Sequence, residues 1–204
     1  NATGNGAVAM TGGTFTLLNG GTFGGSTDWS FQHLTLSGSG ATTVKTASST
    51  VTVAGVLTIA TGHTLLAGNP SVWNFSGNGT PFVVNGTFTP QTTTVRYSGT
   101  SAMNVTNGTY YRLYLAPSGA GGPTYTLGSS PLVVQSTFLI GDGVNAGTTT
   151  ANTNDPSISL YGDIIIRATS TLVASNSGAL DIYRDFITQG QFAHSNGTVN
   201  FLAT

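Results

Sequence analysis

The chain has very little charge. Its 204 residues include five Lys or Arg and six Asp, and Glu is absent. Charged residues make up 5% of the sequence, against about a quarter in an ordinary soluble domain. Five scattered basic residues cannot neutralise a run of phosphates, so we expect no nucleic-acid binding. Because the best charged helix formers are nearly missing and Thr, Gly, Ser and Asn are poor ones, we also expect almost no helix.

Cysteine and long apolar runs are missing as well. The absence of Cys removes disulfides and is compatible with either redox compartment. The longest aliphatic run is Ile164–Ile166, far shorter than a membrane span requires. No basic amphipathic segment indicates binding to a membrane surface.

The residues that are abundant favour β-structure. The chain contains 36 Thr, 20 Ser and 15 Asn together with 29 Gly. Short alternating apolar segments such as Thr14–Leu18, Phe31–Leu36 and Val199–Phe201 recur along the whole chain and are separated by Gly, Asn and Ser. Strands of this length, about 8–12 residues apart, are typical of an all-β sandwich, barrel or solenoid.

Two long imperfect repeats favour the solenoid. Thr43–Gly62 recurs 81 positions later as Thr124–Gly143, and Asn85–Thr100 recurs 104 positions later as Gln189–Thr204. The second copy therefore carries extra residues, which we place around Gly141–Pro156. The repeats predict a β-solenoid region over residues 29–204, with copies at about 31–100 and 110–204. Residues 1–28 are predicted to form an N-terminal coil or an inter-subunit strand segment.

The segments Phe31–Gly68 and Gly178–Thr204 carry the motifs F-x-x-L-T-L, V-x-G-x-L-T-I and G-x-F-x-x-x-x-G-T-V-x-F. They resemble the Gly/Thr/Asn-rich β-solenoid repeats of large secreted microbial surface proteins of the fibre or adhesin type. The resemblance covers most of Trp29–Thr204 and is weaker over Asn1–Asp28. It implies an extracellular or cell-surface location and a fibrous or adhesive role, and it supplies no catalytic residues.

A solenoid of this composition has short strands facing a narrow core. At about 20 residues per coil we expect nine or ten coils in a rod about 45 Å long, since stacked strands lie about 4.8 Å apart. The expected inward residues are Leu34, Leu36, Val51, Val53, Leu57, Ile59, Phe88, Val95 and Tyr97, and in the second copy Leu113, Leu115, Leu132, Val134, Phe138, Ile140, Phe192, Val199 and Phe201. The alternative fold is a β-sandwich pilin that donates Asn1–Asp28 as a strand to its neighbour.

The phase of the repeats favours self-assembly. Gln189–Thr204 opens a repeat unit whose continuation is not present, and the exposed strand edges of a solenoid end are templates for another chain. The sequence therefore predicts a non-enzymatic structural subunit of an extracellular filament, a homopolymer joined head to tail through its strand edges. The alternative is an adhesin or carbohydrate-binding stalk segment of a longer cell-surface protein, with surface glycans as partners.

No catalytic or cofactor-binding residue is predicted. Asp181–Asp185 contains two acids flanking Arg184 and is interpreted as a local ion pair at a coil corner rather than as an acid–base pair. His33, His63 and His194 lack the spacing of metal ligands. Calcium is retained only as a weak hypothesis for the oxygen-rich residues of the apparent insertion, namely Asp142, Asn145, Asn152, Asn154 and Asp155.

Two kinds of surface site are predicted. Asn-x-Ser/Thr sequons are glycosylation candidates in a secreted chain; they lie at Asn1, Asn74, Asn78, Asn85, Asn104, Asn107 and Asn196. If Tyr111, Leu113 and Leu115 face inward, then Tyr110, Arg112 and Tyr114 form an outward ladder suited to an interface. The competing interpretation is a half-buried strand covered by a loop.

Overall fold

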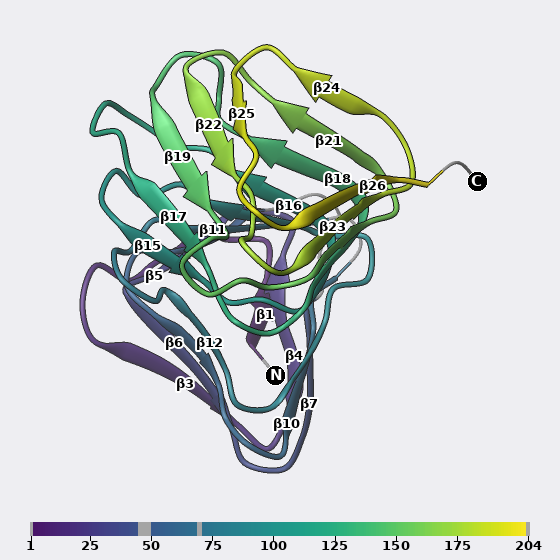
Figure 1. Ribbon diagram of the computed structural model, residues 1–204. Helices are drawn as coiled ribbons and strands as arrows, with labels where there is room; N and C mark the ends of the chain where they lie inside the picture. Colours follow the sequence, from purple (N-terminus) through teal and green to yellow (C-terminus); the bar gives the residue numbers. More distant parts are fainter. Residues whose placement is uncertain (1, 45–49, 69–70, 203–204) are drawn as a thin grey trace. The chain divides into compact units, whose positions relative to one another are not determined.

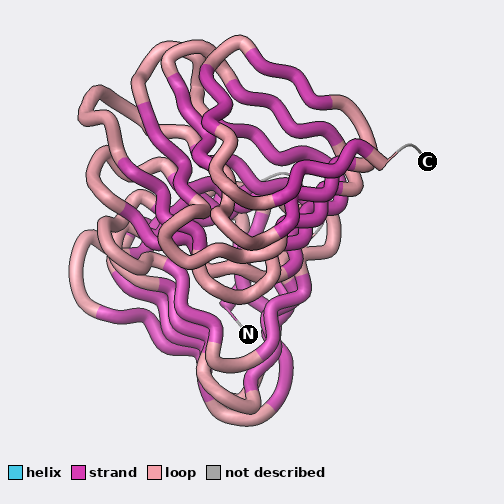
Figure 2. The backbone as a smooth tube through the Cα atoms, viewed as in Figure 1, coloured by secondary structure: helices cyan, strands magenta, loops and turns pink. Residues whose placement is uncertain are grey.

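The computed structural model of the chain describes residues 2–44, 50–68 and 71–202 (Figure 1). These residues form strands and loops and contain no helix (Figure 2). The strands are parallel and stacked into a β-solenoid of about nine turns, which confirms the predicted fold and excludes the sandwich alternative. Within the described ranges no helix could cross a bilayer. The chain forms two compact units, residues 1–95 and 96–204, which are described in turn.

Unit 1 has three strands in each turn. Its first parallel sheet is β1 (Ala2–Gly4), β4 (Gly21–Gly25), β7 (Gly40–Val44), β10 (His63–Leu66) and β13 (Thr87–Thr89). The second contains β2 (Val8–Ala9), β5 (Trp29–Phe31), β8 (Thr50–Val53) and β11 (Val72–Phe75). The third is β3 (Thr14–Leu18), β6 (His33–Ser37), β9 (Leu57–Ile59) and β12 (Phe82–Val84). The segment predicted to be distinct, residues 1–28, supplies β1–β4, which pair in register with later strands of this unit.

Unit 2 is likewise built of stacked parallel strands, and β14 (Thr94–Tyr97) includes residues of both units. One row of strands is β16 (Thr109–Leu115), β18 (Leu132–Ile140), β20 (Ile158–Leu160), β23 (Ala179–Ile182) and β26 (Thr198–Phe201). The second half of β18 also pairs with β21 (Asp163–Ile166), which pairs with β24 (Phe186–Thr188). The third row is β15 (Met103–Val105), β17 (Thr124–Leu127), β19 (Gly147–Thr150), β22 (Ser170–Val173) and β25 (Gln191–Ala193).

The core follows from the register, which places like side chains above one another. In unit 2, Leu113 pairs with Phe138 and Phe138 with Ile164, and all three are 0% exposed. Every residue expected to point inward is at most 1% exposed, apart from Phe88, Phe192, Val199 and Phe201. The alternation of apolar and polar residues therefore sets which face of each strand is buried.

Three tyrosines are buried in unit 2. Tyr97 is 0% exposed, Tyr125 1% and Tyr110 2%. Each hydroxyl has a backbone partner: Tyr97 accepts from the amide of Thr106, Tyr110 donates to the carbonyl of Thr106, and Tyr125 donates to the carbonyl of Gly99. Burial raises the pKa of Tyr97 to about 12 and the pKa of Tyr110 and Tyr125 well above the ordinary value, because a low-dielectric interior disfavours the phenolate.

Candidate functional site

The last coil of unit 2 is open on one side. Among the described residues β24, β25 and β26 each pair with one neighbour only, namely β21, β22 and β23. Unpaired amide and carbonyl groups therefore line the other edge of all three strands. Such edges are templates for pairing with a further strand, so this coil is the first candidate site.

The side chains of this coil form an uncovered aromatic layer. Phe186, Phe192 and Phe201 pair in register with Ile164, Leu172 and Ile182 of the preceding coil, which are all buried. The ring of Phe186 packs edge-on against Phe192 at 5.3 Å and against Phe201 at 6.0 Å between centroids. Phe201 is nevertheless 67% exposed. The layer is built like the core but lacks a coil on its outer side.

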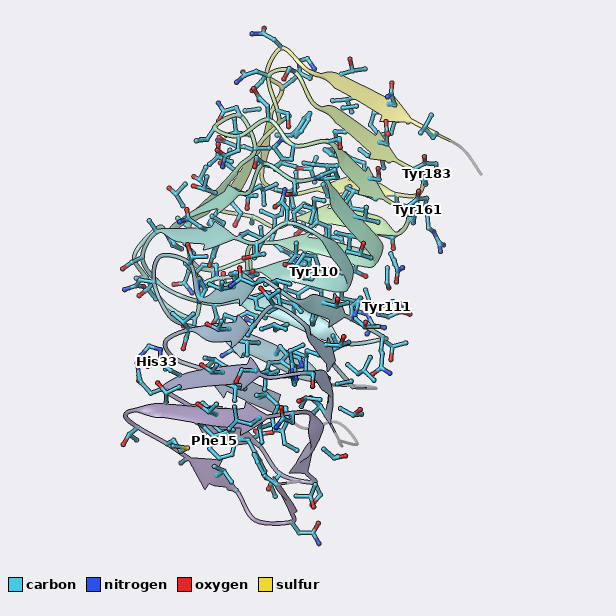
Figure 3. All side chains as sticks on the ribbon, turned by 90° about the horizontal axis from the view of Figure 1, so that it is seen from below. Phe15, His33, Tyr110, Tyr111, Tyr161 and Tyr183 are labelled. Atoms are coloured by element: carbon cyan, nitrogen blue, oxygen red, sulfur yellow. The ribbon has the colours of Figure 1, made fainter. Side chains whose placement is uncertain are left out.

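The first coil of unit 1 has the same character. The inward residues of β2 and β3 are half-buried, among them Val8, Phe15 and Leu17. The ring of Phe15 (Figure 3) packs on Phe31 of the next coil with centroids 5.2 Å apart, and Leu18 at the end of β3 is 66% exposed. Within the described chain β1, β2 and β3 also pair with one neighbour each. Both end coils therefore combine free strand edges with an uncovered apolar layer.

The predicted ladder of Tyr110, Arg112 and Tyr114 is wrong at its first member. Tyr110 points inward and is 2% exposed, while Arg112 and Tyr114 face outward and are half-buried. The cause is an irregularity in the pairing of β16 with β18. Between Tyr110 and Arg112 one residue of β16 lies opposite two residues of β18, and the inward–outward alternation of β16 reverses there. Tyr111 consequently lies on the outside, with the guanidinium carbon of Arg112 4.7 Å from its ring centroid (Figure 3).

A tyrosine pair that sequence reasoning missed lies on the same side (Figure 3). Tyr161 and Tyr183 stack with their centroids 4.6 Å apart and their planes 16° from parallel. Partial desolvation, with Tyr161 and Asp181 nearby, raises the pKa of Tyr183. The signal lies in the register between coils, because each tyrosine directly follows the last residue of paired strands, Leu160 and Ile182. Rings at equivalent positions of neighbouring coils must meet.

The residues of the calcium hypothesis do not form one ligand set. Asp142 and Asn145 precede β19, whereas Asn152, Asn154 and Asp155 follow it. The Asp142 carboxylate accepts hydrogen bonds from the amides of Val144 and Asn145 at 2.8 and 2.7 Å. Although desolvation opposes them, these bonds and one from the Asn145 side chain hold the pKa of Asp142 below its ordinary value. The carboxylate serves as a corner cap.

The second group is also engaged in holding corners together. An oxygen of Asp155 accepts from the amide of Asn176 at 2.6 Å, and the Asn154 side chain donates to the carbonyl of Leu127 at 2.7 Å. No group of three or more His, Asp, Glu or Cys side chains that could hold a metal is found among the described residues. The calcium hypothesis therefore gains no geometric support.

The acid–Arg–acid segment does not pair within itself. The nearest acid oxygen to Arg184 belongs to Asp163 of the preceding coil, with Nε and Oδ1 3.7 Å apart. Asp181 instead accepts from the Asn200 side chain at 2.7 Å. Our interpretation of a local ion pair is thus corrected: parallel stacking brings residues about 20 positions apart closer than their sequence neighbours. The Arg184 side chain is 66% exposed, so this contact stabilises the fold little.

The sequons differ in how accessible their amides are. Asn78, Asn85, Asn104 and Asn196 are exposed. Asn74 lies within β11 with its side-chain oxygen buried. The amide nitrogen of Asn107 donates to the carbonyls of Gly128 and Ser130 at 2.9 and 2.7 Å. Asn1 lies outside the described residues. The four exposed side chains are therefore the better glycosylation candidates.

Comparison of the chain with protein-family models, with curated proteins and with solved structures found no match. The resemblance of its repeats to those of secreted surface proteins accordingly has no support from homologues. The structure supports the coarser part of it, a solenoid of stacked parallel strands.

Proposed function

We propose that the protein is a structural subunit of an extracellular filament. The β24–β26 coil of one copy is covered by the β1–β3 coil of the next, in a head-to-tail homopolymer. The observation that carries this proposal is the uncovered layer of Phe186, Phe192 and Phe201 between free strand edges. A head-to-tail contact between two different surfaces grows without limit unless the rotation closes a ring.

Two physical effects favour the contact. Covering the aromatic layer removes apolar surface from water, at roughly 25 cal/mol per Å². Pairing the edges satisfies backbone groups on three strands at once, as in β-augmentation. The scarcity of charge also leaves few like-charged side chains to oppose stacking. The proposal assigns no catalytic role, and the extracellular location rests on the resemblance of the repeats.

Replacing Phe201 by Asp is expected to block assembly. The substitution puts a carboxylate into the layer that must be desolvated, which costs several kcal/mol when no partner compensates it. Because Phe201 is 67% exposed in the single chain, the fold itself should change little. We expect at least a hundredfold increase in the concentration needed for polymer formation, measured by sedimentation velocity.

The matched control is Val144→Asp. Val144 is 78% exposed and lies in the loop before β19, away from the strands of the open coil, so the same charge should leave polymer formation unchanged. Polymers that form equally well from the Phe201→Asp chain would contradict the proposed contact.

A stalk segment of a longer adhesin is the second candidate. The stacked pair of Tyr161, which is 50% exposed, and the half-buried Tyr183 favours it, because accessible aromatic rings are suitable platforms for sugars. In that case the open coil is covered by further coils of the same chain. Glycan-array binding by a chain that stays monomeric at high concentration would support this candidate over the filament.

A further inference from the structure

One outer face of unit 2 differs from the rest of the surface. It is formed by the second halves of β16 and β18 together with β21 and β24, which lie side by side in Figure 1. We call it the side face. Two columns of outward residues run across its four strands: Tyr114, Leu139, Ile165 and Ile187 in one, and Arg112, Thr137, Asp163 and Asp185 in the other.

The first column is apolar where the chain otherwise uses threonine. Tyr114 pairs with Leu139, Leu139 with Ile165, and Ile165 with Ile187. The first three are half-buried and Ile187 is 42% exposed. In unit 1 the repeat positions that match Tyr114 and Leu139 are Thr35 and Thr58, which pair with each other in the same way. The apolar column is therefore not required by the fold.

The second column is basic at one end of the stack and acidic at the other. Arg112 pairs with Thr137 and Thr137 with Asp163. Asp185 precedes β24 and its carbonyl accepts from the amide of Ile164 at 2.9 Å, which sets it beside Asp163. The base lies at one end and the acids at the other, and Asp163 already has Arg184 as an ion-pair partner. In a chain with 5% charge, such an arrangement is conspicuous.

When a second copy of this column is laid against the first in the opposite direction, the basic end of each meets the acidic end of the other. Consider a two-fold axis that lies in the plane of the face and runs perpendicular to the stacking direction. It brings the side face of a second copy against the first, with the coils of the two copies stacked in opposite directions. Arg112 of each copy then faces Asp185 of the other, and Leu139 faces Ile165. A self-complementary patch is the requirement for an isologous contact. Opposite charges across the contact fix its register.

We propose that the side face packs against the side face of a second copy of this chain in this antiparallel arrangement. The contact differs from the end-to-end contact and does not depend on it. In a filament it would join neighbouring filaments laterally. Two chains already make the contact as a pair, and two filaments that repeat it along their length strengthen it further.

Cross-linking tests the arrangement directly, because the chain has no Cys and single-cysteine variants report one position each. Tyr114→Cys and Ile187→Cys label the two ends of the apolar column and keep both charged residues. Tyr114 and Ile187 are three strands apart, about 14 Å, but each faces the other across the proposed contact. Facing sheets pack about 10 Å apart, a distance that a short bismaleimide spans.

We expect cross-linked dimers from a mixture of the two variants and few from either variant alone. Equal cross-linking of Tyr114→Cys by itself would indicate a parallel contact and overturn the proposal. A mixture that forms no cross-linked dimers would also overturn the proposal. This is the result expected if the side face binds a different partner, such as a polysaccharide. The readout is a covalent dimer and is the same whether or not the chains polymerise, so failure of the filament proposal is seen separately.

Charge reversal adds a rescue test in the same mixture. Arg112→Asp or Asp185→Arg alone should lower the dimer yield about tenfold, because two-fold symmetry turns two attractions into two repulsions. The double variant Arg112→Asp/Asp185→Arg should restore it. Ser129→Arg, an exposed position between β17 and β18, should have no effect. A double variant that cross-links no better than the single ones would overturn the assigned register.

Discussion

Gly162→Ala is expected to destabilise unit 2 strongly. A Cβ at Gly162 would lie 1.3 Å from the carbonyl oxygen of Ser136 and 2.1 Å from its carbonyl carbon. These are backbone atoms of the adjacent coil, held by the pairing of Thr137 with Asp163 one residue on. The coils cannot separate to admit a methyl group without breaking this ladder. We expect a loss of at least about 4 kcal/mol, the range in which overpacking and broken backbone contacts combine.

The measurement is urea unfolding followed by circular dichroism. Gly119→Ala is the matched control, since its Cβ would meet only the Thr100 methyl carbon at the ordinary distance of 3.6 Å. We expect the control to stay within about 0.5 kcal/mol of the wild type. A Gly162→Ala chain as stable as Gly119→Ala would show that the coils are not packed at this distance.

Raising the pH above 10 is expected to unfold the protein. Burial raises the pKa of Tyr97 to about 12, whereas an unfolded tyrosine ionises near 10. The unfolded chain therefore loses its proton first. The contribution of the neutral Tyr97 side chain to the free energy of unfolding is complete below about pH 10 and is lost as the pH rises through 12. Each pH unit in this window removes about 1.4 kcal/mol, and the raised pKa values of Tyr110 and Tyr125 add to the loss.

Urea midpoints between pH 8 and pH 12, together with tyrosinate absorbance, measure this effect. We expect a flat profile up to about pH 10, then a steep fall, with the buried tyrosines ionising only on unfolding. Tyr97→Phe is the control: it removes one ionisation and should make the alkaline fall shallower, although it costs stability at neutral pH because the Thr106 amide loses its partner. Stability that stays constant to pH 12 would contradict the burial of these hydroxyls.

The fold was predictable from the sequence because a solenoid depends on a local pattern, the alternation of inward and outward residues along each short strand. Residues such as Leu34, Leu57 and Phe138 alternate with Thr or other outward residues, and alternation decides which face of a strand is buried. Tyr110 shows the limit of this reasoning. Its inward position goes with an extra residue of β18 in the pairing of β18 with β16, which is a property of two strands and has no signature within β16 alone.

The candidate sites were less predictable for a related reason. The stacked pair of Tyr161 and Tyr183 and the columns of the side face join residues about 22 to 26 positions apart, so they appear only once the register between coils is known. Arg112 and Tyr114 were found because they lie on one strand. Asp163 and Ile165, which lie two strands away in the same columns, were not, since nothing local distinguishes them from other outward residues.

Cryo-electron microscopy of the purified wild-type chain at rising concentration tests the filament most directly. If each copy stacks its end coil on the next, the strands run across the filament and the images give a layer line on the meridian at about 4.8 Å. We expect long filaments with this spacing. Single particles that stay monodisperse at high concentration, or filaments without the axial 4.8 Å repeat, would contradict it.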